Sequence, residues 1–217
     1  MLIGTNKHVG TYYRFSNALL SRVLDEVTLR HALVKSTWWQ GVGNDTQAEL
    51  AITAYRAVHP ESLPGDSFFG IASDLVRDDA IMQAERKSAL AKAAVFMYQF
   101  AWESPAFDGK YGSCHAFELP FVFDNVAAAP QLWGHNPDRR RHELATTMSK
   151  AWAAFAHTGN PSHSGLPRWN SYTVSERATM VLNYSSELIR DPQRDDRLAF
   201  EALRSSRLPA VTTVSPP

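Results

Sequence analysis

The chain has 217 residues, and its 44% hydrophobic and 11% aromatic content is ample for a buried core. Its 22 basic and 22 acidic side chains cancel and are scattered, so DNA, RNA or an anionic membrane is not an expected partner. The single cysteine, Cys114, excludes an internal disulfide framework and a zinc site built from cysteine clusters.

The first residues, Met1 to Lys7, lack the positively charged start and the long apolar run of a secretory signal. The longest apolar runs are far shorter than the roughly 18 residues that a membrane-spanning helix needs. A soluble, cytoplasmic chain is therefore expected.

The first part of the chain predicts one short apolar segment followed by helices. Residues 2–5 are the apolar segment, and residues 11–37 carry leucines and valines at helical spacing. A second helix is expected to open at residues 44–46 and to continue to Val58, with Thr46 and Glu49 as a capping box. His59-Pro60 ends this helix, and the residues up to Gly65 read as a loop.

The rest of the chain adds two strands and several helices. The strands are expected at residues 94–100, which are rich in β-branched and aromatic side chains, and at 179–182. The helices are expected at residues 67–92, as one long helix or two abutting ones, and at residues 141–157 and 195–205. The sequence contains no internal repeat. It predicts one mostly helical unit with few strands.

Residues 112–123, with the sequence GSCHAFELPFVF, place His115 on a Gly/Ser-rich turn after the second predicted strand. A histidine there is suited to proton transfer, because its ordinary pKa lies near neutrality and a loop can direct it into a cleft. Whether His115 can act as a base depends on its neighbours.

Seven segments in this order resemble the C-terminal part of the type-B carboxylesterases, the α/β-hydrolases that include cholinesterases and bacterial para-nitrobenzyl esterases. The segments are Leu2–Thr11, Ser73–Ile81, Val95–Phe100, Gly112–Phe123, Trp152–Pro161, Trp169–Tyr172 and Arg177–Leu182. The resemblance implies an α/β fold over residues 1–208, mostly helical, with about three strands of an incomplete sheet. Residues 209–217 are expected to be a disordered tail.

The resemblance also implies a catalytic role for one residue of the chain. His115 takes the position of the histidine in the family's serine–acid–histidine triad, and the acid position is occupied by Val9. The 217 residues contain neither the Gly-x-Ser-x-Gly turn of the nucleophile nor the glycine loop of the oxyanion hole. Valine cannot orient an imidazole or stabilise its charged form, so position 9 does not supply the usual activation of His115.

Two functions follow as hypotheses. The first is a carboxylesterase segment that contributes to carboxylic ester hydrolysis only when a partner completes it. The second is a non-catalytic truncated remnant, or a module that binds a small molecule or another protein. Expected partners are a small carboxylic ester, the N-terminal half of a split esterase, or a second copy of the chain paired through an open sheet edge. No cofactor and no metal are expected.

Other residues near His115 allow weaker alternatives. Cys114 could form a dyad with His115, but adjacent side chains usually diverge, and a buried thiol is the plainer reading. His8 could replace the acid's hydrogen bond but not its charge. Glu118 could pair with His115 on a metal, or support the loop by hydrogen bonding. The aromatic residues of this region line a substrate pocket or pack in the core: Trp102, Phe117, Phe121, Phe123 and Trp133. The pair Trp38-Trp39 could place one indole at an interface.

Overall fold

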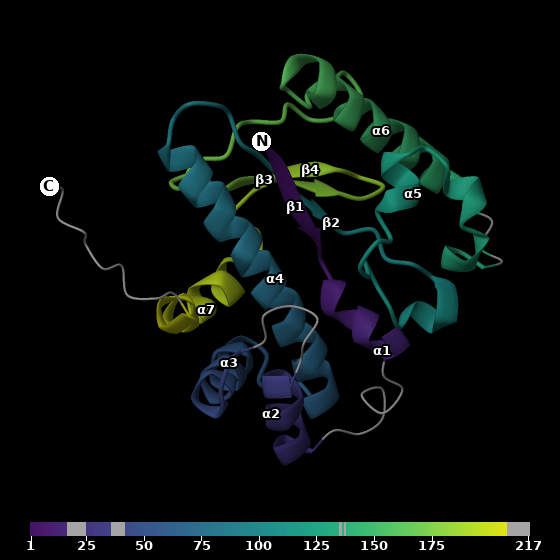
Figure 1. The fold of residues 1–217 in the computed structure, drawn as a ribbon. Helices are drawn as coiled ribbons and strands as arrows, with labels where there is room; N and C mark the ends of the chain where they lie inside the picture. Colours follow the sequence, from purple (N-terminus) through teal and green to yellow (C-terminus); the bar gives the residue numbers. More distant parts are fainter. Residues whose placement is uncertain (17–24, 36–41, 135, 137, 208–217) are drawn as a thin grey trace, which may run out of the picture.

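The computed structural model describes residues 1–16, 25–35, 42–134, 136 and 138–207. In this part of the chain four strands form one sheet, in the order β1 (Leu2–Asn6), β2 (Phe96–Phe100), β3 (Ala178–Leu182) and β4 (Glu187–Arg190) (Figure 1). The first three strands are parallel, and β4 runs antiparallel to β3. The carboxyl ends of β1, β2 and β3 therefore lie along one edge of the sheet.

Seven α-helices and four short 3-10 turns are described around this sheet. The α-helices are α1 (Tyr13–Ser16), α2 (Glu26–Lys35), α3 (Asp45–Val58), α4 (Pro64–Ala89), α5 (Leu119–Val122), α6 (Arg140–Thr158) and α7 (Arg194–Arg207). The 3-10 turns are η1 (Val9–Tyr12), η2 (Ala106–Gly109), η3 (Val126–Ala128) and η4 (Pro130–Leu132). Within the described ranges no helix is long and apolar enough to cross a membrane.

Strand β2 has buried side chains on both of its faces. Successive side chains of a strand point to opposite sides of the sheet, so each face of β2 packs against a different cluster. Phe96 and Phe100 join an apolar cluster that includes Leu144 and Met148 of α6. Met97 points the other way and packs with Ile81 of α4. Helices α6 and α4 thus cover opposite faces of the sheet (Figure 1).

A second helical cluster lies at the lower end of the molecule in Figure 1, where α2, α3 and α7 gather around α4. Its buried side chains come from all four helices and include Leu33, Ile52, Ile71 and Phe200. Helix α4 is therefore shared between the sheet and this cluster. This double role explains why so many of its side chains are buried between Ser67 and Ala84.

Three expectations about elements need correction. The sheet has a fourth strand, β4, that the sequence did not predict. Residues 11–37 are not one helix, because α2 begins only after Asp25, whose carboxylate accepts the Thr28 N–H at 2.8 Å. The cap of α3 is Asn44 and not Thr46: its side-chain oxygen accepts the Gln47 N–H at 2.9 Å.

The other predicted elements are present, with shifts of a few residues at their ends. Helix α4 begins at Pro64, within the expected loop, because proline is favoured in the first helical turn. The pair Trp38-Trp39 and the expected tail, residues 209–217, lie outside the described residues.

Candidate active site at the carboxyl edge of the sheet

Two loops meet at the carboxyl edge of the sheet, one following β1 and one carrying His115. The His8 backbone N–H donates to the Ser113 carbonyl at 3.2 Å, and the Ser113 N–H donates back to Nδ1 of His8 at 3.1 Å. These reciprocal bonds hold loop 7–12 against loop 111–115. The structure therefore brings the segment containing Val9 beside the segment containing His115.

Gly112 permits this close approach. Its φ of +51° favours glycine, and a Cβ at this position would lie 2.5 Å from Nδ1 of His8. The Thr11 hydroxyl adds a third link by donating to the Tyr111 carbonyl at 2.7 Å. The glycine of this Gly/Ser-rich turn is thus required by the close contact with His8.

His115 lies on a four-residue turn from Cys114 to Phe117, closed by the Phe117 N–H donating to the Cys114 carbonyl at 3.1 Å. The imidazole is exposed, and its ring meets the edge of the Tyr12 ring at 5.4 Å between centroids. The next residue, Ala116, has φ +66°, a left-handed conformation that costs energy for a residue with a Cβ. The turn that exposes His115 therefore contains a strained residue.

Asn6, at the carboxyl end of β1, is the residue of this region that sequence reasoning missed. Its side-chain amide donates to the Cys114 carbonyl at 2.6 Å and to the Glu118 carboxylate at 2.5 Å. The residue is buried, with 6% of its surface exposed. A polar residue at the carboxyl end of a parallel strand is the signal that could have identified it.

Val9 is buried in η1, with 7% of its surface exposed, and supplies no carboxylate to the site. The adjacent residue anchors the loop on α4: the Gly10 N–H donates to Oγ of Ser73 at 2.9 Å, and that hydroxyl donates to the Phe69 carbonyl. These hydrogen bonds hold the loop that contains Val9 in place on α4.

His8 is half-buried, and its imidazole supplies no negative charge beside the His115 loop. Burial lowers the pKa of its imidazole below the ordinary value, Lys7 lowers it further, and Glu103 opposes both. Nδ1 must be unprotonated to accept the Ser113 N–H, which agrees with a neutral ring at neutral pH. His8 serves as a structural acceptor between the two loops.

The surroundings of Cys114 and Glu118 agree with a buried thiol and a loop-supporting carboxylate, respectively. Cys114 is fully buried, and burial raises the pKa of its thiol to about 11, so the thiolate needed for nucleophilic attack is scarce at neutral pH. The Glu118 carboxylate accepts the hydrogen bond from Asn6 and so supports the loop. Over the described ranges, no group of three or more potential ligands is arranged to hold a metal ion.

The aromatic residues near the site are mostly core residues. Trp102, Phe117, Phe121 and Trp133 are at most 8% exposed and belong to the cluster beneath α6. Phe123 is the exception, with 70% of its surface exposed. Core packing is therefore the reading that fits four of the five.

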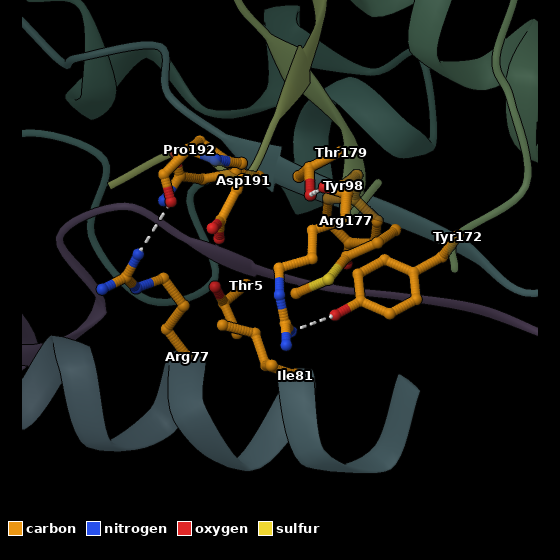
Figure 2. Close-up of a pocket in the computed structure, with 11 residues that line it drawn as sticks. Thr5, Arg77, Ile81, Tyr98, Tyr172, Arg177, Thr179, Asp191 and Pro192 are labelled. Atoms are coloured by element: carbon orange, nitrogen blue, oxygen red, sulfur yellow. Dashed lines mark hydrogen bonds between the residues drawn. The ribbon is translucent and has the colours of Figure 1, made fainter. Parts of the chain in front are cut away.

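Two cavities lie near the sheet without His115 in their walls. A small one of about 20 Å³ sits between the sheet and α4, where Arg177 donates to the Tyr172 hydroxyl at 2.9 Å and Asp191 faces Thr5 (Figure 2). It has room for about one water molecule and not for an ester. A larger cavity of about 280 Å³ opens beside Lys7 and His8 and reaches the buried Asp74 of α4.

Comparison with known proteins connects this geometry to one family. Residues 1–201 match the model of the carboxylesterase family. The phenmedipham hydrolase of Pseudarthrobacter oxydans is 31% identical over 160 residues, 70% of this chain and 32% of that protein. The para-nitrobenzyl esterase of Bacillus subtilis is 33% identical over 107 residues, 48% of this chain and 21% of that protein.

Solved structures agree with the sequence matches. A thermophilic para-nitrobenzyl esterase is 29% identical with a TM-score of 0.70, covering 91% of this chain and 37% of that one. A carboxylesterase of Geobacillus stearothermophilus is 27% identical with a TM-score of 0.74, covering 92% of this chain and 40% of that one. The chain thus spans about a third or less of the curated relatives described above. With its sheet, its helices and most of its length matched in this way, the chain belongs to the carboxylesterase family and has part of the α/β-hydrolase fold.

Proposed function

We propose that residues 1–217 supply the histidine of a carboxylesterase active site that hydrolyses carboxylic esters through a serine acyl-enzyme. The observation that carries the proposal is the pair of reciprocal hydrogen bonds between His8 and Ser113. These bonds set the loop at the family's acid position against the loop that presents His115. In this proposal the serine and the oxyanion-hole donors come from an N-terminal carboxylesterase portion.

The proposed chemistry has two proton-transfer cycles through His115. The serine hydroxyl attacks the ester carbonyl carbon while the imidazole takes the hydroxyl proton, and the imidazolium then protonates the departing alkoxide. Water next attacks the acyl-enzyme, gives its proton to the imidazole and releases the carboxylic acid, and the serine regains its proton. The chain's own residues hold and move the proton, and the N-terminal portion supplies the nucleophile.

Because position 9 carries valine and not an acid, we expect slow ester hydrolysis from this site. In serine proteases, spoiling the role of the triad acid lowers turnover by about 10⁴. The neutral imidazole of His8 provides no compensating charge, and its Nδ1 is occupied by the Ser113 N–H. We therefore expect residues 1–217 alone to be inactive and a completed enzyme to be slow.

The test joins Met1 to the portion of a para-nitrobenzyl esterase that precedes its structural equivalent, and measures hydrolysis of a short-chain nitrophenyl ester. We expect slow hydrolysis that His115→Ala abolishes. His142→Ala, a change at an exposed histidine of α6, is the matched control and should leave the rate unchanged. Hydrolysis no faster than that of the His115→Ala variant would contradict the catalytic proposal.

A second candidate is a non-catalytic module that keeps the fold for binding a small molecule or another protein. The burial of an apolar Val9 at the family's acid position favours it. In this case the joined chain binds a non-hydrolysable ester analogue, measured by calorimetry, without turnover of the ester. Turnover that depends on His115 excludes this candidate.

A further inference from the structure

One buried side chain holds the turn of His115 at two points. Asn6 donates to the Cys114 carbonyl at 2.6 Å, on the residue before His115, and to the Glu118 carboxylate at 2.5 Å, three residues after it. A side-chain amide has two N–H donors, and both are used here. The partners are 108 and 112 residues away in sequence, so Asn6 ties β1 directly to the turn.

We infer that Asn6 is a positioning residue for His115: its amide fixes the turn from which the imidazole is presented. An effect of Asn6 on catalysis rests on the function proposed above, whereas its effect on the orientation of His115 does not.

The conformation of the turn explains why it needs such a restraint. The Cys114 carbonyl also closes the turn by accepting the Phe117 N–H at 3.1 Å. Inside the turn Ala116 has φ +66°, a region that favours glycine or asparagine. A strained residue of this kind persists when the surrounding contacts over-determine it. Asn6 supplies two such contacts from the rigid sheet.

The position of Asn6 also connects the two loops of the site. It is the last residue of β1, and the loop with His8 and Val9 starts at the next residue. The same strand end therefore determines the start of one loop and, through the amide, the shape of the other. Substitution of Asn6 should release the His115 turn while the reciprocal bonds of His8 and Ser113 remain.

The experiment uses NMR on the full 217-residue chain. The ring protons of His115 are assigned by their loss in His115→Gln, and their nuclear Overhauser contact with the Tyr12 ring reports the edge-on pair at 5.4 Å. We expect this contact in the wild type and its loss in Asn6→Ala. Asn44→Ala is the matched control, because it removes the remote cap of α3 and destabilises the fold without touching the turn. It should keep the contact.

Glu118 provides a second, independent pair of variants. Glu118→Ala removes one of the two acceptors of Asn6 and should weaken the Tyr12–His115 contact. Glu118→Gln keeps a side-chain oxygen as acceptor and should preserve it. If Asn6→Ala does not fold, this pair decides.

The inference is wrong if a folded Asn6→Ala keeps the wild-type contact, or if Glu118→Ala and Glu118→Gln behave alike. Ester hydrolysis plays no part in these measurements. An inactive joined chain counts against the proposed function alone, and a preserved contact counts against Asn6 alone.

Discussion

Gly10 follows Val9 in the loop after β1 and packs so closely on helix α4 that only a glycine fits there. A Cβ there would lie 2.4 Å from the Phe69 carbonyl oxygen and 2.8 Å from Cβ of Ala72. Both neighbours belong to the helix, so neither can move without displacing it. The Gly10 N–H is also bound to Ser73. Close packing on α4 thus fixes where the Val9 loop lies.

Gly10→Ala should therefore destabilise the chain by about 1–3 kcal/mol, the usual cost of overpacking a well-packed site. Urea denaturation measures this loss. Gly65→Ala is the control, because Gly65 lies in the first turn of the same helix and a Cβ there meets no atom within 4 Å. That change should be neutral or stabilising, since alanine is the better helix former. Equal effects of the two changes would refute the packing argument.

Residue-level prediction from the sequence succeeds where a local pattern carries the signal. The family resemblance predicts that Val9 and His115 belong to one region, and the structure brings their loops together. Asn6 could not be predicted in the same way, because its role depends on two partners that are distant in sequence. The two hydrogen bonds between His8 and Ser113 could not be predicted for the same reason, because these residues are also far apart in sequence.

Helices α3, α4 and α7 meet around buried charges that the sequence pattern does not show. Asp74 of α4 pairs with Arg77 at 2.9 Å, and Arg77 also donates to the Pro192 carbonyl just before α7. His59, after α3, pairs with Asp196 of α7 at 2.6 Å. Burial nevertheless raises the pKa of Asp74 from 3.8 to about 6, against the opposing effect of Arg77.

This raised pKa predicts a pH-dependent stability. The folded chain binds the Asp74 proton more tightly than the unfolded chain does, so this group favours folding most below about pH 4. Its contribution is lost as the pH rises to about 6, by as much as about 3 kcal/mol. In urea denaturation, the wild type should therefore lose stability relative to Asp74→Asn over this range.

The control for Asp74 is Asp66→Asn on the same helix, because the Asp66 side chain is 63% exposed. This variant keeps the buried Asp74 carboxyl, so relative to Asp74→Asn it should lose stability between pH 4 and pH 6 as the wild type does. A wild type that gains stability relative to Asp74→Asn between pH 4 and pH 6 would show that the Arg77 pair outweighs burial.

Elements with a strong apolar pattern were predicted, and those without one were not. Helix α6 buries side chains at helical spacing, and β2 is a short run of apolar and aromatic side chains buried on both faces. The predicted ranges of both elements agree closely with the structure. Strand β4 is short, and its residues are mostly exposed, so it lacks the alternation that identifies a strand. It is stabilised by pairing with β3 and by Leu188, which packs against the cluster beneath α6. Tertiary contacts therefore determine this element.

Across the whole molecule, the sheet and the exposed aromatic residues favour association. Within the described residues β1 pairs only with β2, so its other side has no partner strand. Phe15, Phe107 and Phe123 are 49%, 57% and 70% exposed. An unpaired strand edge and apolar surface both promote contacts with other chains.

We therefore predict that the 217-residue chain self-associates in solution. Sedimentation velocity over a tenfold range of concentration should show a species that grows with concentration. Joining the N-terminal carboxylesterase portion should reduce this association, because that portion provides an intramolecular partner. A single monomeric species with a cooperative thermal transition would contradict the prediction.

The central claim is that His115 acts as the base and that position 9 is where its acid partner belongs. The most direct measurement compares Val9→Glu with Val9→Gln in the joined chain, by kcat for a nitrophenyl ester. The two side chains have the same length, and only the glutamate can stabilise the imidazolium. We predict that Val9→Glu is faster than Val9→Gln by on the order of tenfold or more, as expected if part of the acid's roughly 10⁴ effect is restored. Equal rates for the two variants would contradict the claim.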